Sequence, residues 1–334
     1  MSHKKKANIQ VLSAFNLSFI QRDINILQKH YNVRTNLFDK LPKSPFNLIK
    51  TIWKIFSTVK KCDISYIWFV EWRAFLTALF SRLLNKKSVL IVGGYEVVKL
   101  PEIDYGGQLS WYNRLLFRWS IKLTDRVLAV SKSIKDDIFK HTGFAKAKVV
   151  YNGVDPDKFY AAGTKENIII TVGYVKKSNL TRKGLENFVK TAKYLPQIKF
   201  YLIGKVLDDS IDYLKSIAND NVNFEGYVTF DKLRSYYQKA KVYVQTSAHE
   251  GFGISLAEAM LSECVPVVTS HGALPEVVGN TGFYVEYNNP EETAASIEKA
   301  LNSSSGSAAR QRIENHFSLS NREEQLIKII KNLL

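Results

Sequence analysis

The residues with the clearest chemical pattern lie between positions 242 and 259, where an apolar run leads into a short loop and then a helical pattern. The loop places two glycines directly before the expected helix. Free backbone N–H groups at a helix N-terminus bind anions, and glycines let an anion approach the backbone closely. This pattern predicts a diphosphate-binding loop, formed by Gly251, Phe252, Gly253, Ile254 and Ser255.

Two glutamates flank this loop. We expect Glu258, in about the first turn of the helix, to accept two vicinal ribose hydroxyls, as carboxylates do in Rossmann folds. Glu250, before the helix, is placed to accept hydroxyls from a sugar. Each acid also has an ordinary explanation, because an acid near a helix N-terminus gains about 0.3–1 kcal/mol from the helix dipole and a loop acid is commonly exposed. The whole arrangement favours a nucleotide and sugar site.

Short apolar runs alternate with helical patterns along the chain, which predicts parallel strands buried on both faces of doubly wound sheets. The expected strands are 9–15, 64–70, 89–92, 127–131, 149–151, 168–175, 199–203, 222–224, 242–245, 265–268 and 283–285. The expected helices are 18–31, 47–60, 72–84, 109–122, 133–140, 184–194, 210–218, 231–239, 255–261, 290–301 and 308–334.

With 334 residues the chain is too long for one ordinary core. A turn cluster at 152–156 and small residues at 161–164 predict a linker over 152–166 between two Rossmann-like domains. We therefore predict an N-terminal domain over 1–155, a C-terminal domain over 156–310, and a final helix over 311–334 that packs back on the first domain. Ligands bind outside the carboxyl ends of the strands in such sheets, so we expect a cleft between the domains.

Composition excludes several classes of protein. A hydrophobic content of 46% with 23% charged residues is typical of a folded globular chain. Cys62 and Cys264 lie far apart without clustered histidines, which predicts neither a disulfide framework nor a zinc site. The basic start lacks an apolar signal region, and charged residues interrupt the most apolar stretch, residues 64–84. We expect a cytoplasmic protein that does not span the membrane.

The positive charge is concentrated in the first half of the chain. Residues 1–160 contain 27 Lys and Arg against 12 Asp and Glu, a net charge of +15, out of +16 for the whole chain. Such an excess predicts an anionic partner. Residues 47–56 and 111–119 combine aromatic residues with lysines and arginines, so they are either core-facing helices with basic edges or a surface that binds anionic lipid. No nucleic-acid-binding motif accompanies the charge.

The segment EGFGISLAEAM at 250–260 resembles the signature of retaining GT-B glycosyltransferases, the family 4 or "glycosyl transferases group 1" enzymes. The segments CVPVVTSHGALPEVVG at 264–279 and TRKGLENFV at 181–189 extend the resemblance. In the first half, only residues 92–98, 125–138 and 151–159 look similar to family elements.

The resemblance implies transfer of a sugar from a nucleotide-diphosphate sugar to an acceptor, without a catalytic metal and without a separate cofactor. Glu250 would contact the donor sugar, Glu258 the ribose, and Lys183 with a nearby arginine the leaving diphosphate. Fixed cations and amides aimed at the departing phosphate stabilise the transition state more than the ground state. The acceptor would be a glycan or lipid-linked glycan precursor, and the enzyme would lie peripherally on the cytoplasmic face of a membrane.

The chain departs from the family pattern in two places. The usual Gly-Arg after the first strand of the second domain is Gly173-Tyr174, so we expect Arg182 to supply the second cation, with Lys176 or Lys177 as alternatives. The glycine-rich loop after the first N-terminal strand is replaced by SAFNLSF at 13–19, from which Asn16 is a candidate cleft residue.

Other candidate cleft residues each have a structural explanation. Gly93, Gly94 and Glu96 follow an apolar strand and form either part of an acceptor site or a tight turn. His249 adjoins Glu250 but fits a structural role slightly better. Ser131 is expected to cap a helix rather than touch the donor.

Two other functions stay open. The same scaffold could support sugar-nucleotide epimerisation or phosphorolysis, although the Glu250 and Glu258 pattern favours transfer. The charge alone would also fit a non-catalytic module that binds membranes or nucleic acid.

Overall fold

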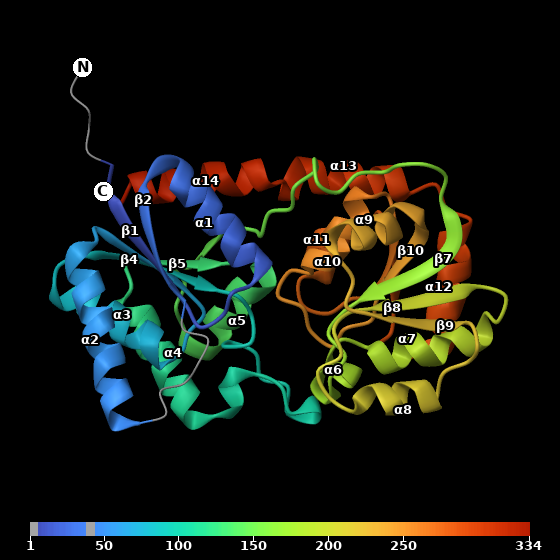
Figure 1. Ribbon diagram of the computed structural model, residues 1–334, viewed down its shortest axis with the longest axis horizontal. Coiled ribbons are helices and arrows are strands. Elements are labelled where there is room, and N and C mark those ends of the chain that lie inside the picture. Colours follow the sequence, from blue (N-terminus) through green and yellow to red (C-terminus); the bar gives the residue numbers. More distant parts are fainter. Residues whose placement is uncertain (1–5, 38–43) are drawn as a thin grey trace, which may run out of the picture. The chain divides into compact units, whose positions relative to one another are not determined.

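The computed structural model describes residues 6–37 and 44–334, so the basic start at 1–5 and residues 38–43 lie outside the described residues (Figure 1). The chain divides into two compact units. Unit 1 contains residues 1–152 and 322–334, and unit 2 contains residues 153–321. Each unit has a six-stranded parallel sheet flanked by helices, which confirms the predicted pair of doubly wound Rossmann-like domains.

The sheet of unit 1 has the strand order β2-β1-β3-β4-β5-β6. Apart from Lys87, its central strands β3 and β4 are buried, and most of their residues are apolar. The strands are β1 Asn8–Ser13, β2 Asn32–Leu37, β3 Ile64–Trp68, β4 Lys87–Val92, β5 Arg126–Ala129 and β6 Lys148–Val149. The helices are α1 Ser18–His30, α2 Pro45–Lys61, α3 Trp72–Leu83, α4 Trp111–Leu123 and α5 Lys132–Thr142, with α14 Leu319–Lys331 returning to this unit from residue 322.

Unit 2 repeats the architecture with the order β12-β11-β10-β7-β8-β9. Phe188, Phe200, Val244 and Ile297 belong to the core between its sheet and helices. The strands are β7 Glu166–Val172, β8 Lys199–Ile203, β9 Val222–Gly226, β10 Ala240–Gln245, β11 Val265–Thr269 and β12 Phe283–Val285. The helices are α6 Lys177–Arg182, α7 Leu185–Thr191, α8 Ser210–Ser216, α9 Phe230–Lys239, α10 Ile254–Leu261, α11 Leu274–Val278, α12 Pro290–Leu301 and α13 Gly306–Phe317.

The strand orders define one topological switch point in each sheet. In unit 1 the chain leaves β1 for β2 on one side and later places β3 on the other. In unit 2 it adds β8 and β9 on one side of β7 and then β10 on the other. Ligands of open parallel sheets bind beyond the carboxyl ends of the strands at such points. The loops after β1 and β3, and after β7 and β10, are therefore the places where each unit can hold a ligand.

Four elements differ from the sequence prediction. The edge strand β2 was not expected because its sequence, NVRTNL, is mostly polar. The helices α6 and α11 are too short to show an apolar period. The single helix expected over 308–334 is two helices, α13 and α14, separated at Ser318, whose backbone is extended.

Candidate active site

The loops at the switch point of unit 2 bring together the residues that the sequence marked. Gly173 and Tyr174 follow β7, and residues 246–253 connect β10 to α10. Two glycines with left-handed backbone conformations, Gly184 and Gly272, allow the loops of this region to pack closely together. A Cβ on Gly184 would lie 2.2 Å from the carbonyl oxygen of Thr246, and one on Gly272 would lie 2.4 Å from that of Glu250. A larger side chain at either position would force the loop that carries Glu250 to move.

Glu250 is buried and forms an ion pair with Lys183. The hydroxyl of Ser247 donates a hydrogen bond of 3.2 Å to the same carboxylate oxygen, and Thr269 Oγ1 donates to the carbonyl of Ser247 at 2.6 Å. Burial alone would raise the pKa of Glu250, but Lys183 and Arg182 outweigh it and hold the pKa below the usual range. Burial lowers the pKa of Lys183, although Glu250 opposes that effect. The side chains of Lys183 and Glu250 are 23% and 9% exposed, so the ion pair is partly shielded from solvent.

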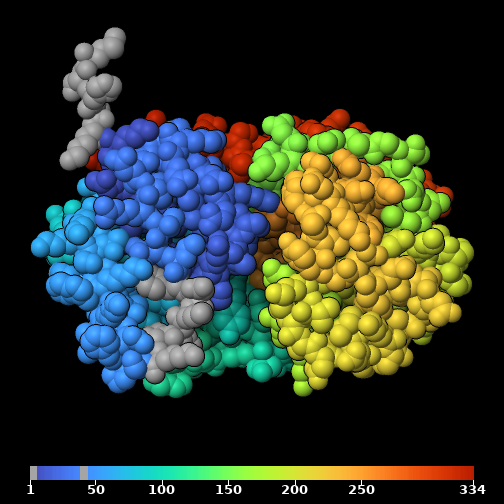
Figure 2. Space-filling model, in the orientation of Figure 1, coloured from blue at the N-terminus to red at the C-terminus, as the bar shows by residue number. Residues whose placement is uncertain are grey.

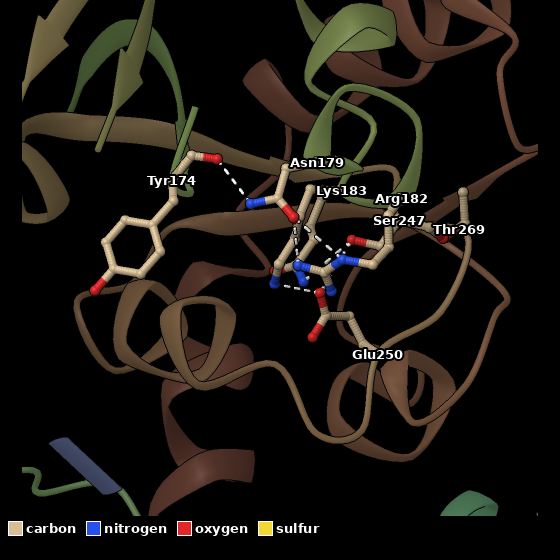
Figure 3. A network of polar contacts seen from close by, with 8 residues as sticks. Tyr174, Asn179, Arg182, Lys183, Ser247, Glu250 and Thr269 are labelled. Atoms are coloured by element: carbon tan, nitrogen blue, oxygen red, sulfur yellow. Dashed lines mark hydrogen bonds and ion pairs between the residues drawn. The ribbon is translucent and has the colours of Figure 1, made fainter. Parts of the chain in front are cut away.

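Arg182 is oriented by a residue that the sequence analysis did not mark. Its Nε and Nη2 donate to Oδ1 of Asn179 at 3.1 and 2.6 Å, and Asn179 Nδ2 donates to the carbonyl of Tyr174 at 2.7 Å (Figure 3). Asn179 is itself buried. Arg182 also lies near enough to Lys183 to lower the pKa of that lysine. Two adjacent cations, Arg182 and Lys183, thus lie beside Glu250.

The alternative cations lie in different surroundings. The backbone N–H of Lys177, at the start of α6, donates to a carboxylate oxygen of Asp208 at 2.9 Å, and the side chain of Lys177 is exposed. Lys176 is half-buried, and its charge helps to lower the pKa of Asp208 after hydrogen bonds from Ser210 and Lys177. These contacts favour Arg182 as the second cation.

The predicted diphosphate loop leads into α10. Gly253 caps the helix in the left-handed region, with φ of 92°, and its carbonyl accepts from the N–H of Ala257 at 3.0 Å. The side chain of Phe252 is buried and packs edge-on against Phe317, with ring centroids 5.5 Å apart. Any contact between residue 252 and a donor therefore comes from its backbone. Gly251, Ile254 and Ser255 are partly exposed.

Glu258 is the fifth residue of α10, at the start of the second turn, because the helix begins at Ile254. Its position weakens the helix-dipole explanation, since that effect fades beyond the first turn. The residue is buried, and after burial its charge is the largest contribution raising the pKa of Tyr237. A buried acid at this end of the sheet fits a ligand-binding role better than a dipole contact.

The candidate residues of unit 1 follow β1 and β4. The carboxylate oxygens of Glu96 accept from the backbone N–H groups of Gly93 and Gly94 at 2.9 and 3.1 Å, which forms the tight turn considered above. Burial raises the pKa of Glu96 to about 7 despite these hydrogen bonds. Asn16 is exposed and accepts from Gln21 Nε2 at 2.7 Å.

Two further residues can be placed. His249 is half-buried beside Glu250 in unit 2 and contributes to lowering the pKa of that acid. Ser131 caps α5, since its hydroxyl accepts from Ile134 N at 3.2 Å, as predicted. Asn179, Ser247 and Thr269 are the polar residues around Glu250 and Arg182 that sequence reasoning missed. Only the Asn179 to Arg182 spacing of three, which places both on one helix face, could have indicated one of them.

Within the described residues, no group of three or more His, Cys, Asp or Glu side chains is arranged to hold a metal ion. Among the helices of residues 6–37 and 44–334, none combines the length and apolar character required to cross a bilayer.

Two six-stranded parallel α/β units of this kind form the GT-B fold of glycosyltransferases. Residues 157–317 match the family described as Glycosyl transferases group 1, and residues 18–158 match Glycosyltransferase Family 4. The two matches together span residues 18–317, and the chain belongs to the family 4, or group 1, glycosyltransferases.

Known proteins agree with that assignment. The chain is 32% identical to the O-antigen chain mannosyltransferase RfbU of Salmonella typhimurium over 54% of its length, and spans about half, 51%, of that relative. It is 26% identical to the uncharacterized glycosyltransferase MJ1069 of Methanocaldococcus jannaschii, covering 92% of this chain and 86% of that one. Anabaena HepE, solved with UDP and glucose, has the same fold, with a TM-score of 0.79, 18% identity, and coverage of 97% and 99%.

Proposed function

We propose that this chain transfers a hexose from a nucleoside-diphosphate sugar to a glycan acceptor, with retention of the anomeric configuration and without a metal ion. The observation that carries the proposal is the ion pair between the partly buried Lys183 and the buried Glu250, beside Arg182, at the switch point that leads into α10. The relative RfbU is named for transfer of mannose to an O-antigen chain, and HepE was solved with UDP and glucose, which supports both halves of the reaction.

The paired cations suit departure of a nucleoside diphosphate. As the bond between the sugar and the β-phosphate breaks, negative charge grows on the phosphate oxygens. Lys183 and Arg182, together with the backbone N–H groups before α10, would face that charge and stabilise the transition state. A hydrogen bond to a charged group contributes about 1.5–3 kcal/mol, so several of them can replace a divalent cation.

The carboxylates suit recognition of the sugar and the ribose. Glu250 is ionised in a buried position, where an acceptor of hydroxyl hydrogen bonds is strongest. Glu258, buried at the beginning of the second turn of α10, would bind the ribose hydroxyls. The ion pair with Lys183 holds Glu250 in place before the donor arrives.

For the acceptor, we propose a lipid-linked precursor of a surface glycan, bound while unit 1 rests on the cytoplasmic face of a membrane. The helix α2 carries the exposed side chains Phe46, Ile49 and Trp53 among exposed lysines, and forms part of the surface of unit 1 (blue in Figure 2). Exposed aromatic and basic residues together are typical of surfaces that bind anionic lipid.

A thermal-shift screen of the purified protein tests the donor half of the proposal. UDP-, GDP- and ADP-sugars are added in the presence of EDTA, with the Glu258→Ala variant alongside. A donor at 100 times its dissociation constant should stabilise the folded state by about 2.7 kcal/mol. One sugar nucleotide that stabilises the native protein and not the variant supports the proposal. No response of folded protein to any of them would reject it.

A further inference from the structure

Two tyrosine hydroxyls are buried in unit 2 without a hydrogen-bond partner in the described part of the chain. Tyr237 lies on α9 and Tyr243 on β10, and both side chains are fully buried. No residue within 6–37 and 44–334 forms a hydrogen bond with either hydroxyl oxygen. A buried hydroxyl left unpaired costs free energy that phenylalanine, which has the same ring, would avoid. Such groups are uncommon in folded proteins, so each one requires an explanation.

Both hydroxyls belong to the face of the sheet that α10 covers. Val242 and Val244 belong to the core formed with α7 and α12, so Tyr243 between them points to the opposite face. On that face α9 packs against β7, and α10 packs against α9 and β10 (Figure 1). The rings of Tyr237 and Tyr243 lie next to each other there, with centroids 6.2 Å apart.

Two polar residues of α10, Ser255 and Glu258, are neighbours of these hydroxyls. They are three positions apart, so they share one side of the helix. Burial raises the pKa of both tyrosines, the charge of Glu258 raises it further, and the hydroxyl of Ser255 opposes these effects. For Tyr243, the charge of Glu250 contributes more than that of Glu258. The two hydroxyls therefore lie under the start of α10, beside the acid proposed to bind ribose.

The four groups can form one chain of hydrogen bonds. A tyrosine hydroxyl donates one hydrogen, a serine hydroxyl donates one and accepts two, and a carboxylate accepts several. Ser255 can thus accept from both tyrosines and donate to Glu258, whose carboxylate can still accept from ribose hydroxyls. Hydrogen bonds in such a chain polarise and strengthen one another. In active sites these bonds are often long before the ligand binds, and they shorten in the complex.

We infer that Tyr237 and Tyr243 are positioning residues for recognition of the donor ribose. When the ribose hydroxyls bind Glu258, both tyrosines donate to Ser255, and Ser255 donates to Glu258. Because the two hydroxyls gain partners only in the complex, they add to the affinity for a ribonucleotide. The inference rests on the proposed function, and it names the residues that act behind the ribose-binding acid.

Removal of the two hydroxyls tests the inference. The double variant Tyr237→Phe/Tyr243→Phe keeps both rings. Isothermal titration calorimetry on the whole chain measures binding of UDP, GDP and ADP, and of the 2′,3′-dideoxy analogue of each one that binds. We expect the ribonucleotide to bind about ten-fold more weakly to the double variant, and the dideoxy analogue to bind both proteins alike. Urea unfolding without nucleotide should show equal or higher stability, because no hydrogen bond has been lost.

Tyr66→Phe is the matched control, since the buried hydroxyl of Tyr66 donates to Asp23 at 2.6 Å. It should lower the stability and leave nucleotide binding unchanged. Three results would overturn the inference: unchanged ribonucleotide affinity of the double variant, an equal loss with the dideoxy analogue, or a loss of stability as large as that of Tyr66→Phe. By contrast, native protein that binds none of the three nucleotides would reject the proposed function, and this inference with it.

Discussion

The buried side-chain amide of Asn179 helps to orient the guanidinium of Arg182. Asn179 accepts two hydrogen bonds from Arg182 and returns one to the carbonyl of Tyr174. Tyr174 stands where the family usually has an arginine, so we propose that Arg182, on the helix that follows, supplies the second cation. A cation placed by its neighbours before the reaction costs no reorganisation when charge develops.

Replacing Asn179 by alanine should therefore impair turnover more than binding. We expect Asn179→Ala to lower kcat by about ten-fold, with little change in KM for the donor, because the stabilisation lost is that of the transition state. Release of nucleoside diphosphate from the donor found in the screen gives both constants. Ser178→Ala, an exposed neighbour, serves as the control.

The conservative variant Asn179→Asp separates positioning from folding. It keeps an acceptor for Arg182 and loses the donor to the carbonyl of Tyr174, so it should recover most of the turnover. Equal losses of activity and stability in both variants would show that Asn179 has only a structural role.

Glu96 should make the stability of unit 1 depend on pH. Burial raises its pKa from 4.5 to about 7, so the folded state binds a proton that the unfolded state has released over this range. The stabilisation is complete below pH 4.5 and is lost as the pH rises through 7. Since one pKa unit corresponds to about 1.4 kcal/mol, the free energy of unfolding should fall by up to about 3 kcal/mol over this pH range.

Urea unfolding between pH 5 and 8 checks this prediction. The free energy of unfolding of the native protein should fall relative to that of Glu96→Gln as the pH rises. Glu71, also in unit 1, has a pKa raised by burial as well, with Arg73 opposing it, so Glu71→Gln is compared in parallel. Parallel curves for native protein and Glu96→Gln would contradict the prediction.

At the scale of elements, apolar patterns predicted most of the fold. The bounds of β8, β12 and α12 agree with the expected residues, since continuous apolar runs and clear turn residues delimit them. The pattern could not find α6, whose six residues span less than two turns. The role of Asn179 was missed with it, because that role exists only once α6 has folded beside β7. The sequence did predict three site residues, because the motifs mark them directly: Glu250, Glu258 and Lys183.

The division of the last helix has a similar cause. The helical pattern runs through Ser318 without a glycine or proline, so the sequence predicts one helix. In the structure, backbone hydrogen bonds join Val154 to Phe317 and Leu319 to Val154, each about 3 Å long. This tertiary pairing interrupts the helix, and a one-dimensional pattern does not contain it.

A buried ion pair between Arg322 and Asp23 attaches α14 to α1. Asp23 on α1 accepts from Arg322 Nε and Nη2 at 2.6 and 2.7 Å, and also from Tyr66 and Trp68. Arg322 Nη1 donates to the carbonyls of Val150 and Tyr151, the last at 2.7 Å. Both carboxylate oxygens of Asp23 and all three guanidinium nitrogens of Arg322 thus have hydrogen-bond partners.

Arg322→Ala should cost about 3–5 kcal/mol of unfolding free energy, because it leaves the carboxylate of Asp23 buried without a cation. Glu323→Ala is the control, since its partners Lys29 and His30 are partly exposed and such a surface pair contributes about 1 kcal/mol or less. Urea unfolding of both variants checks the difference. Similar losses in the two variants would contradict the buried-pair argument.

At the scale of the whole molecule, the dominant feature is the unequal distribution of charge. Residues 1–160 carry a net charge of +15, whereas residues 161–334, with 20 Lys and Arg against 19 Asp and Glu, carry +1. A donor site needs only a few cations, and those around Lys183 belong to the nearly neutral half. The excess in the first half therefore requires another explanation. We propose that it binds an anionic membrane surface, which would also explain the exposed aromatic residues of α2.

If that explanation holds, binding to vesicles is selective for charge and sensitive to salt. The protein should co-sediment with phosphatidylglycerol vesicles at 50 mM salt and much less at 500 mM, and only weakly with phosphatidylcholine vesicles, because salt screens the attraction. Each lysine near the surface contributes about 1 kcal/mol, so reversing the exposed Lys50 and Lys54 together should weaken binding by at least a hundred-fold. Lys215→Glu with Lys193→Glu makes the same charge change in unit 2 and should leave binding nearly intact. Equal effects of the two double variants would mean that the lipid responds to net charge alone, and the α2 surface would lose its assigned role.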